Sequence, residues 1–255
     1  MPKDCMGRFC SVPQKLARTE IGQVGDVNYR MFFKDSSGAL ISPWHDIPLP
    51  SMDKKNSWFP FLCEIPKGRT EKMEVCLSEK FNPIAQDTKD KKPRYLSIVP
   101  KFNYGMFPRT FETPKKACPI SGLLGDGDPI DVVDIATKAL TLGSLVPVKI
   151  LGSFCFVDGG EADWKVVVSS NENDELNKHV LEVMFGFFEQ YKGPESGNFI
   201  FDDRKVFGVG ETIELIKLAN MNYNELKQSY RMTRTGGESD EDEPHDIWVP
   251  GSERV

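Results

Sequence analysis

Short runs of apolar residues dominate the first 170 positions and predict a series of β-strands. The runs are rich in β-branched and aromatic residues, which favour pleated, half-buried strands. Clusters of Gly, Pro, Asp and Ser separate them, as expected for tight turns. We predict strands over residues 27–34, 61–65, 72–77, 94–99, 130–135, 145–157 and 163–170.

The spacing of apolar residues changes to intervals of three and four after residue 173. Leu176, Val180 and Phe187 follow this helical spacing, which places them on one face of an amphipathic helix. Asn and Asp are preferred helix caps, so we predict that the helix begins at Asn173 or Asp174.

A second helix is predicted over residues 211–231, where Ile216, Tyr223 and Tyr230 share one face. Many short strands followed by two helices are typical of an α+β protein and differ from alternating strand–helix units. The pattern therefore predicts a mainly β fold, a β-barrel with two main flanking helices and terminal extensions.

The length and composition fit one large folded unit with a polar tail. The chain has 255 residues, of which 39% are hydrophobic and 27% charged, and this composition can build a single core. We predict one domain over residues 1–232, with its core at about 29–192. The acidic run at 238–243 repels itself, so we expect residues 233–255 to form a mobile tail.

Charge, hydropathy and cysteine spacing argue against several classes of protein. A net charge of -6 offers nucleic acid no general attraction. No run of apolar residues is long enough to span a bilayer, and the first ten residues lack the apolar segment of a secretion signal. The six cysteines form no CxxC pair, which favours reduced thiols. We predict a cytoplasmic protein that binds neither nucleic acid nor membrane.

Three carboxylates fall close together in a turn at Asp126, Asp128 and Asp131. Carboxylate oxygens in such a turn suit a hard cation. Taken alone, however, a cluster of this kind is more often a solvated turn. Its spacing also fails the EF-hand pattern, so the cluster needs support from elsewhere in the chain.

Two further charged segments give that support. Strand alternation places Asp163 and Lys165 on one face of their segment, and Lys72 and Glu74 on one face of another. Carboxylates that could hold metal and ammonium groups that could hold phosphate would therefore lie side by side. The sequence shows no GxSxG nucleophile motif and no Walker phosphate loop.

The three segments together resemble the family I soluble inorganic pyrophosphatases of the eukaryotic type. The family signature D-[SGDN]-D-[PE]-[LIVMF]-D is met by residues 126–131, and E-I-P-x-x-x-x-x-K-x-E is met by residues 64–74. The resemblance extends over about 29–192. It implies a small closed, five-stranded, OB-like β-barrel. It also implies an inorganic diphosphatase that splits pyrophosphate into two phosphates with water activated between Mg²⁺ ions.

The resemblance also implies a role for each candidate residue. Asp128 would be the general base. Three to four Mg²⁺ ions would be held by Asp126, Asp131, Asp158, Asp163 and Glu74. The phosphoryl groups would be bound by Lys72, Arg94, Tyr104, Lys165, Tyr191 and Lys192. Glu64, Asp87, Glu112 and Glu161 would support the metal shell, often through water.

Two other classes of function stay open on the sequence alone. A hydrolase of nucleotides or sugar phosphates could also use Asp-held magnesium, although no element for a base or sugar is apparent. A non-enzymatic cation-binding module would gain nothing from cationic side chains such as Lys72 and Lys165 beside its site. A homodimer is left open, because Lys67 and Gly68 depart from the family in regions that usually form dimer contacts.

Overall fold

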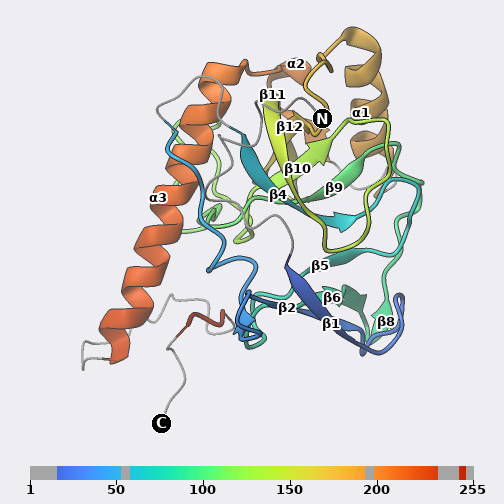
Figure 1. Ribbon diagram of the computed structural model, residues 1–255. Helices are drawn as coiled ribbons and strands as arrows, with labels where there is room; N and C mark the ends of the chain where they lie inside the picture. Colours follow the sequence, from blue (N-terminus) through green and yellow to red (C-terminus); the bar gives the residue numbers. More distant parts are fainter. Residues whose placement is uncertain (1–15, 53–57, 193–197, 235–246, 251–255) are drawn as a thin grey trace.

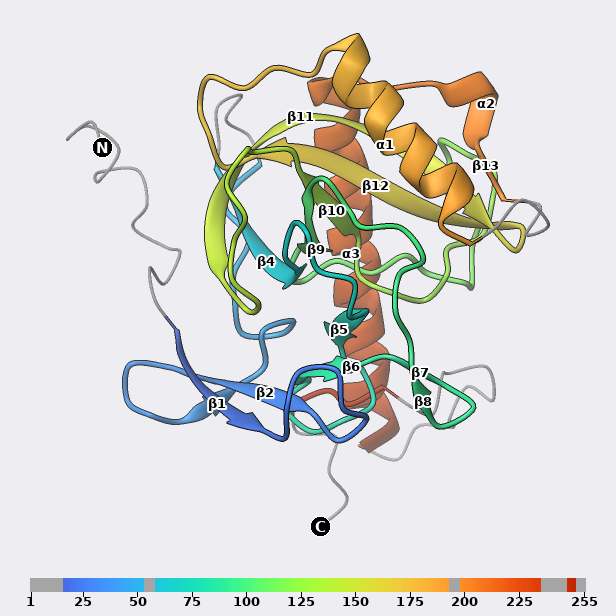
Figure 2. The same cartoon turned by 90° about the vertical axis from the view of Figure 1, so that its right-hand side faces the viewer.

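Two β-sheets and one long helix form the described part of the chain. The computed structural model describes residues 16–52, 58–192, 198–234 and 247–250 (Figure 1). The long helix follows one side of the molecule, and both sheets lie beside it (Figures 1 and 2).

Five strands close into a barrel, because each pairs with two others and the last returns to the first. Around the barrel these are β4 (Phe59–Ile65), β9 (Asn103–Met106), β10 (Asp131–Asp134), β12 (Glu161–Ser169) and β11 (Leu145–Asp158). The β10–β12 pair is parallel and the other four are antiparallel. A short strand, β13 (Phe199–Ile200), adds to β11. The predicted closed five-stranded barrel is confirmed.

The second sheet packs beside the barrel and carries one wall of the site described below. Its strand order is β1-β2-β6-β5, with β3 paired to β2, and a separate hairpin joins β7 to β8. The strands are β1 (Ala17–Ile21), β2 (Arg30–Lys34), β3 (Leu40–Ile41), β5 (Met73–Val75), β6 (Ile84–Gln86), β7 (Thr88–Lys89) and β8 (Lys92–Pro93).

The strand predicted at 94–99 is wrong. That segment forms one isolated bridge, between Tyr95 and Glu71, and continues as an irregular loop. The side-chain amide of Gln86 donates to the Arg94 carbonyl at 2.7 Å. The same carbonyl also accepts from the Lys72 N–H at 3.1 Å, and the Leu96 N–H donates to the Thr70 carbonyl at 2.7 Å, so the backbone pairing extends over this one bridge. Pro100, which closes the segment, has no N–H to donate.

The first long helix, α1 (Lys178–Gln190), begins four residues later than predicted. The carboxylate of Asp174 accepts hydrogen bonds from Ser169 and Asn171 at 2.6 and 2.9 Å and so belongs to a preceding turn. Asn177 is the actual cap, since its side chain accepts from the Val180 N–H at 3.1 Å.

The predicted second helix is present as α3 (Val209–Arg234), preceded by the short α2 (Phe201–Arg204). Glu211 turns back and accepts from the Gly208 N–H at 2.9 Å, which satisfies a donor at the helix start. Along α3, Ile216 packs on the barrel, and Tyr223 packs on the second sheet. The helix therefore ties the two sheets together.

A third apolar cluster joins α1 to the barrel. Phe185 and Phe188 of α1 are buried against Phe154 and Phe156 of β11, with ring centroids 5.2 to 5.7 Å apart. Such aromatic pairs bury large areas and fix geometry. The packing holds the C-terminal end of α1, which carries two candidate phosphate-binding residues, next to the barrel.

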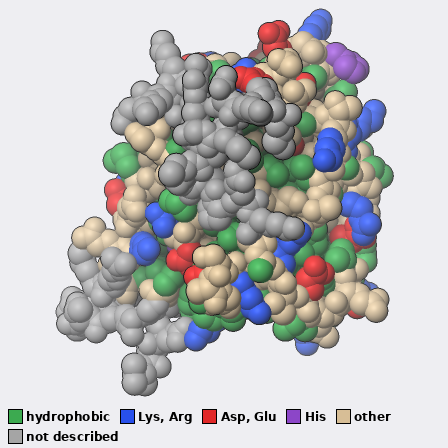
Figure 3. Space-filling view, viewed as in Figure 1, with side chains coloured by type: hydrophobic (Ala, Val, Ile, Leu, Met, Phe, Trp, Pro, Cys, Tyr) green, Lys and Arg blue, Asp and Glu red, His purple; other side chains and the backbone are tan. Residues whose placement is uncertain are grey.

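The surface shows charges of both signs. On the face of Figure 3, basic and acidic side chains are interspersed over the described residues. Within the described ranges, none of the helices has the length and apolar character needed to cross a bilayer.

The end of the predicted tail contacts the core. Residues 235–246 and 251–255 lie outside the described residues, but the Trp248 N–H donates to the Leu77 carbonyl at 2.7 Å, and Val249 is buried. Trp248 also contacts His45, whose Nε2 lies 3.0 Å from the Trp248 carbonyl. Part of the segment expected to be mobile is thus packed on the second sheet.

This contact makes stability depend on pH. His45 is buried; its Nε2–H donates to the Trp248 carbonyl, and its Nδ1 accepts from Tyr223. Burial, assisted by the charges of Lys227 and Arg109, lowers the pKa of His45 to about 4 from an ordinary 6.5. Between pH 6.5 and 4, His45 is therefore protonated in the unfolded chain but neutral in the folded chain. The unfolding free energy falls as pH drops through this range.

We expect the unmodified protein to lose about 2 kcal/mol of unfolding free energy between pH 7 and pH 5 through this group. His45→Gln keeps a hydrogen-bond donor and an acceptor but does not titrate. Its unfolding free energy, measured by urea denaturation, should therefore fall by about 2 kcal/mol less between pH 7 and pH 5. The matched control is His179→Gln on the exposed side of α1. Equal pH dependence of all three proteins would contradict this role of His45.

Candidate active site

A cavity of about 570 Å³ lies where the barrel, the second sheet and the end of α1 meet. Twelve of the sixteen predicted site residues line it. They are Glu64, Lys72, Glu74, Arg94, Tyr104, Asp126, Asp128, Asp131, Asp158, Asp163, Tyr191 and Lys192. The remaining four are Asp87, Glu112, Glu161 and Lys165, of which three contact lining residues directly through side chains or backbone.

The turn at 125–128 is held by a hydrogen bond within the turn and by two backbone hydrogen bonds to Glu112. Gly127 has φ +86°, a conformation that glycine adopts without strain. The carboxylate of Asp126 accepts from the Asp128 N–H at 3.0 Å. Behind the turn, the Glu112 N–H donates to the Asp128 carbonyl at 2.8 Å, and the Gly127 N–H to the Glu112 carbonyl at 2.9 Å. The acidic turn is thus a fixed element.

Burial and neighbouring negative charges raise the pKa values of the carboxylates in this turn. Burial, followed by the charges of Asp128 and Asp131, raises the pKa of Asp126 to about 8. Burial within the cleft, followed by Glu74 and Asp131, raises the pKa of Asp128 to about 7. Both carboxylates repel a further negative charge, and a bound cation would relieve that repulsion.

A buried lysine joins the two carboxylates on the barrel side. Lys165 of β12 is 1% exposed, and its ammonium forms ion pairs with Asp131 and Asp163. The same ammonium lies 3.0 Å from the Tyr104 hydroxyl, which donates to Asp131. The prediction that Asp163 and Lys165 share a strand face is confirmed, and Trp164 between them packs in the core.

A second cationic group forms the opposite wall. The Lys72 ammonium pairs with Glu74 at 2.7 Å and with Asp87 at 2.6 Å, which confirms that Lys72 and Glu74 share a face. Arg94 pairs with the same Asp87 oxygen at 2.6 Å. Although burial lowers the pKa of Lys72, the neighbouring carboxylates raise it above the ordinary value, so the group stays charged.

The end of α1 supplies the third wall. Burial raises the pKa of Tyr191 to about 12. Lys192 pairs with Asp158 at the tip of β11. Burial and the nearby charges of Lys72 and Arg94 lower the pKa of Lys192, which indicates that cationic groups from two walls face one another. A dianionic or tetra-anionic ligand between them would relieve that repulsion.

The donor set fits a hard divalent cation. Oxygen atoms of Glu112, Asp126 and Asp163 lie within 4.8 Å of one another. Glu112 is buried, and its Oε2 has no hydrogen-bond partner among the described residues. Burial, followed by the charges of Asp126 and Asp163, raises the pKa of Glu112. All three donors are carboxylate oxygens, which are the ligands that Mg²⁺ prefers.

Not every predicted residue reaches the site. Glu161 is exposed, opposite Asp158 in the β11–β12 hairpin, and does not line the cavity. Conversely, Ile247 and Met106 line it and were not predicted. Ile247 begins the apolar run Ile247-Trp248-Val249 in a tail that is polar before it, and this run was the available sequence signal.

Comparisons with known proteins agree with this geometry. A family model described as inorganic pyrophosphatase matches residues 61–224. A soluble inorganic pyrophosphatase of Arabidopsis thaliana, described as chloroplastic, is 38% identical over 217 residues, covering 80% of this chain and 68% of the relative. A type I inorganic pyrophosphatase structure from Toxoplasma gondii has a TM-score of 0.77 at 34% identity, covering 83% of this chain and 100% of that one.

One related structure contains a ligand. It is a truncated vacuolar soluble pyrophosphatase of Trypanosoma cruzi in complex with PPi, with a TM-score of 0.75 at 28% identity. The alignment covers 86% of this chain and 94% of that one.

Removing one crowded carboxylate should stabilise the protein when no metal is present. The pKa of Asp126 is raised from 3.8 to about 8, so its contribution to stability is lost as pH rises through that range. In EDTA at pH 8.5, the unfolding free energy of Asp126→Asn should be higher than that of the unmodified protein by on the order of 1 kcal/mol. The advantage should shrink at pH 5, where Asp126 is protonated in the folded state.

Excess Mg²⁺ should stabilise the unmodified protein more than Asp126→Asn. Urea denaturation in EDTA and in Mg²⁺ measures both effects. Glu161→Gln, an exposed carboxylate outside the cavity, serves as the control and should match the unmodified protein. Destabilisation of Asp126→Asn in EDTA would show that repulsion does not govern this turn.

Proposed function

The chain belongs to the inorganic pyrophosphatase family and hydrolyses inorganic pyrophosphate, and on that premise we propose which residues carry out the reaction. The observation that carries the proposal is the arrangement around one cavity. Carboxylates of the acidic turn and β12 face ammonium and guanidinium groups of the second sheet and α1. Cations and a polyanion can thus be held together.

The cofactor is a divalent metal, and we propose Mg²⁺, with three to four ions per site. Asp126, Asp131, Asp158, Asp163 and Glu74 would hold them, supported by Glu64, Asp87 and Glu112, whereas the exposed Glu161 is left out of the proposal. When bound, such ions polarise the phosphoryl oxygens and lower the pKa of water. Glu64 supports the cleft from behind, since its carboxylate accepts from the Val75 N–H at 2.7 Å.

Six side chains are proposed to bind the two phosphoryl groups. Lys72 and Arg94 approach from the second sheet, joined by Asp87. Tyr104 and Lys165 approach from the barrel, 3.0 Å apart, while Tyr191 and Lys192 approach from α1. As the bond to the bridging oxygen breaks, negative charge grows on the leaving phosphate, and fixed cations stabilise it without reorganising.

Asp128 is proposed as the general base. Its carboxylate lies on the cavity side of a turn that Gly127 and Glu112 hold rigid. A water oxygen forms a bond to one phosphorus and gives its proton to Asp128, and the bridging oxygen leaves with the second phosphate. A metal-filled site would keep this carboxylate ionised, since cations favour the charged form.

Location and assembly are also proposals. The described cysteines Cys63, Cys76, Cys118 and Cys155 are all free thiols, which supports a reducing compartment such as the cytosol. A homodimer is kept as the alternative to a monomer, and analytical ultracentrifugation distinguishes them.

The role of Asp128 can be tested by replacement. Asp128→Asn keeps the size and one oxygen but cannot accept the proton, so kcat should fall roughly 10²-fold or more. Mg²⁺ affinity, measured by calorimetry, should change less than in Asp131→Asn, which loses a proposed metal ligand. Turnover near that of the unmodified enzyme, with an unchanged acidic limb of the pH–rate profile, would rule out Asp128 as the base.

The phosphate role of Arg94 has a matched control. Arg94 and Arg69 each pair with one acidic residue, at 2.6 and 2.7 Å, but only Arg94 lines the cavity. Arg94→Ala should reduce kcat for pyrophosphate by about 10²-fold, whereas Arg69→Ala should retain it. Equal rates for the two variants, with unchanged circular dichroism, would remove Arg94 from the proposal.

A further inference from the structure

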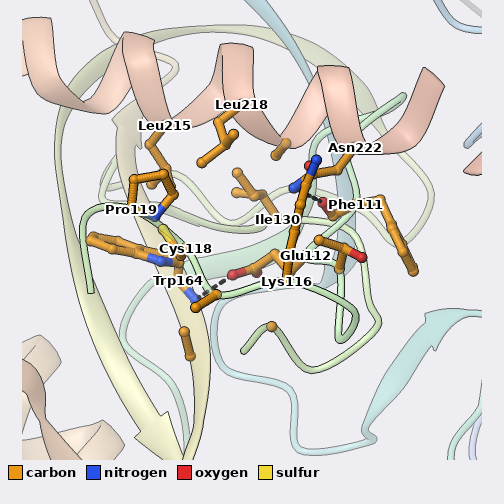
Figure 4. A pocket seen from close by; sticks show the side chains of 15 residues that line it. Phe111, Glu112, Lys116, Cys118, Pro119, Ile130, Trp164, Leu215, Leu218 and Asn222 are labelled. Carbon is orange, nitrogen blue, oxygen red and sulfur yellow. Dashed lines mark hydrogen bonds between the residues drawn. The ribbon is translucent and has the colours of Figure 1, made fainter. Parts of the chain in front are cut away.

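A second cavity lies behind the acidic turn, between the barrel and α3. Its volume is about 220 Å³. Figure 4 shows Leu215, Leu218 and Asn222 of α3 on one side, with Ile130 and Trp164 on the other. The wall is mainly apolar. The loop at 113–119 covers the outer side, where Lys116 pairs with Glu225 of α3 at 2.7 Å.

Three buried polar atoms of this wall lack a partner among the described residues. They are Glu112 Oε2, Asn222 Oδ1 and Trp164 Nε1. The residues are 6%, 8% and 1% exposed. Buried polar groups are nearly always hydrogen-bonded, and leaving one unpaired is costly. An occupant of this cavity would therefore need an N–H or O–H donor for the two oxygens, an acceptor for the indole N–H, and an apolar body.

We propose that this cavity binds a neutral aromatic molecule with a cyclic amide, and that its occupancy is coupled to the metal site. The amide N–H would donate to Glu112 or Asn222, and the amide oxygen would accept from Trp164. An apolar cavity of about 150 Å³ holds benzene, so about 220 Å³ admits a bicyclic ring.

Water alone matches this cavity less well. Water molecules could bond to the three polar atoms, but they would also have to lie against Leu215, Ile130 and Ala219, where they find no partner. Ordered buried water needs two to four polar partners each. A molecule with an apolar body and one polar edge covers the apolar wall and pairs with two of the three polar atoms, which leaves room for one water at the third.

The coupling follows from a shared wall. Glu112 lines this cavity, and one of its carboxylate oxygens belongs to the cluster with Asp126 and Asp163. Its backbone is bonded to the acidic turn at Gly127 and Asp128. Gly125 of the same turn also lines the cavity. A Cβ at this position would lie 2.4 Å from the Glu112 backbone, so the two backbone segments are in close contact.

An occupant that displaces Glu112 must therefore act on the metal-binding turn. Coupling between two ligands is reciprocal, so the occupant and Mg²⁺ change each other's affinity by the same factor. This part of the inference rests on the proposed metal site, whereas binding in the cavity does not.

The probe is oxindole, a neutral bicyclic lactam, titrated into the full chain by calorimetry in EDTA and in saturating Mg²⁺. We expect saturable binding. N-methyloxindole, which lacks the N–H donor, should bind about fivefold more weakly. Saturation with Mg²⁺ should change oxindole affinity by about fivefold, and oxindole should change Mg²⁺ affinity equally.

Two variants on α3 locate the site. Leu218→Trp fills the cavity and should weaken oxindole binding at least about tenfold, while Met221→Trp, on the exposed side of α3, should leave it unchanged; circular dichroism verifies that both fold. Absence of saturable binding, or equal affinity of oxindole and N-methyloxindole, would overturn the cavity site.

Binding that is unaffected by Mg²⁺ would overturn the coupling. Because the titration in EDTA needs no metal and no turnover, an error in the catalytic assignments would leave the binding result intact and would appear only in the Mg²⁺ comparison.

Discussion

Mutual repulsion among carboxylates confined to one cleft is the constraint on which the rest of the structure depends. Asp126 and Asp128 come from one turn, Asp131 begins β10, and Asp163 approaches from β12. Burial, followed by the charges of neighbouring carboxylates, raises the pKa values of Asp126 and Asp128 and so opposes their ionisation. Lys165, buried between two of the carboxylates, offsets part of the repulsion. Divalent cations would offset the remainder.

Holding such charges in place requires a rigid frame, and the fold supplies it in two ways. The barrel closes on itself, so its strands have paired neighbours on both sides and little freedom to move apart. Helix α3 packs on both sheets through Ile216 and Tyr223 and fixes the distance between the barrel carboxylates and the cationic wall. The second cavity lies in this joint, where a displacement would reach the acidic turn through Glu112.

Much of this arrangement could be predicted from the sequence, because strand alternation and short-range turns are local. The shared faces of Asp163 with Lys165 and of Lys72 with Glu74 follow directly from a two-residue repeat. The start of α1 was missed because Ser169 and Asn171 donate to Asp174 and hold it in a preceding turn. The strand predicted at 94–99 was wrong because its pairing with residues 70–72 extends over one bridge only. Ile247 in the cleft and the cavity behind Glu112 depend on contacts between distant segments, which no local pattern encodes.

The central claim is that cations convert a repulsive cleft into a site for a polyanion. Imidodiphosphate, a pyrophosphate analogue with a nitrogen bridge, tests it by calorimetry in saturating Mg²⁺ and in EDTA. Because bare carboxylates repel the analogue and bound cations bridge to its oxygens, we predict affinity at least about 10²-fold higher with Mg²⁺. Equal affinity in EDTA would contradict the account, since Lys72, Arg94, Lys165 and Lys192 would then suffice to hold the ligand.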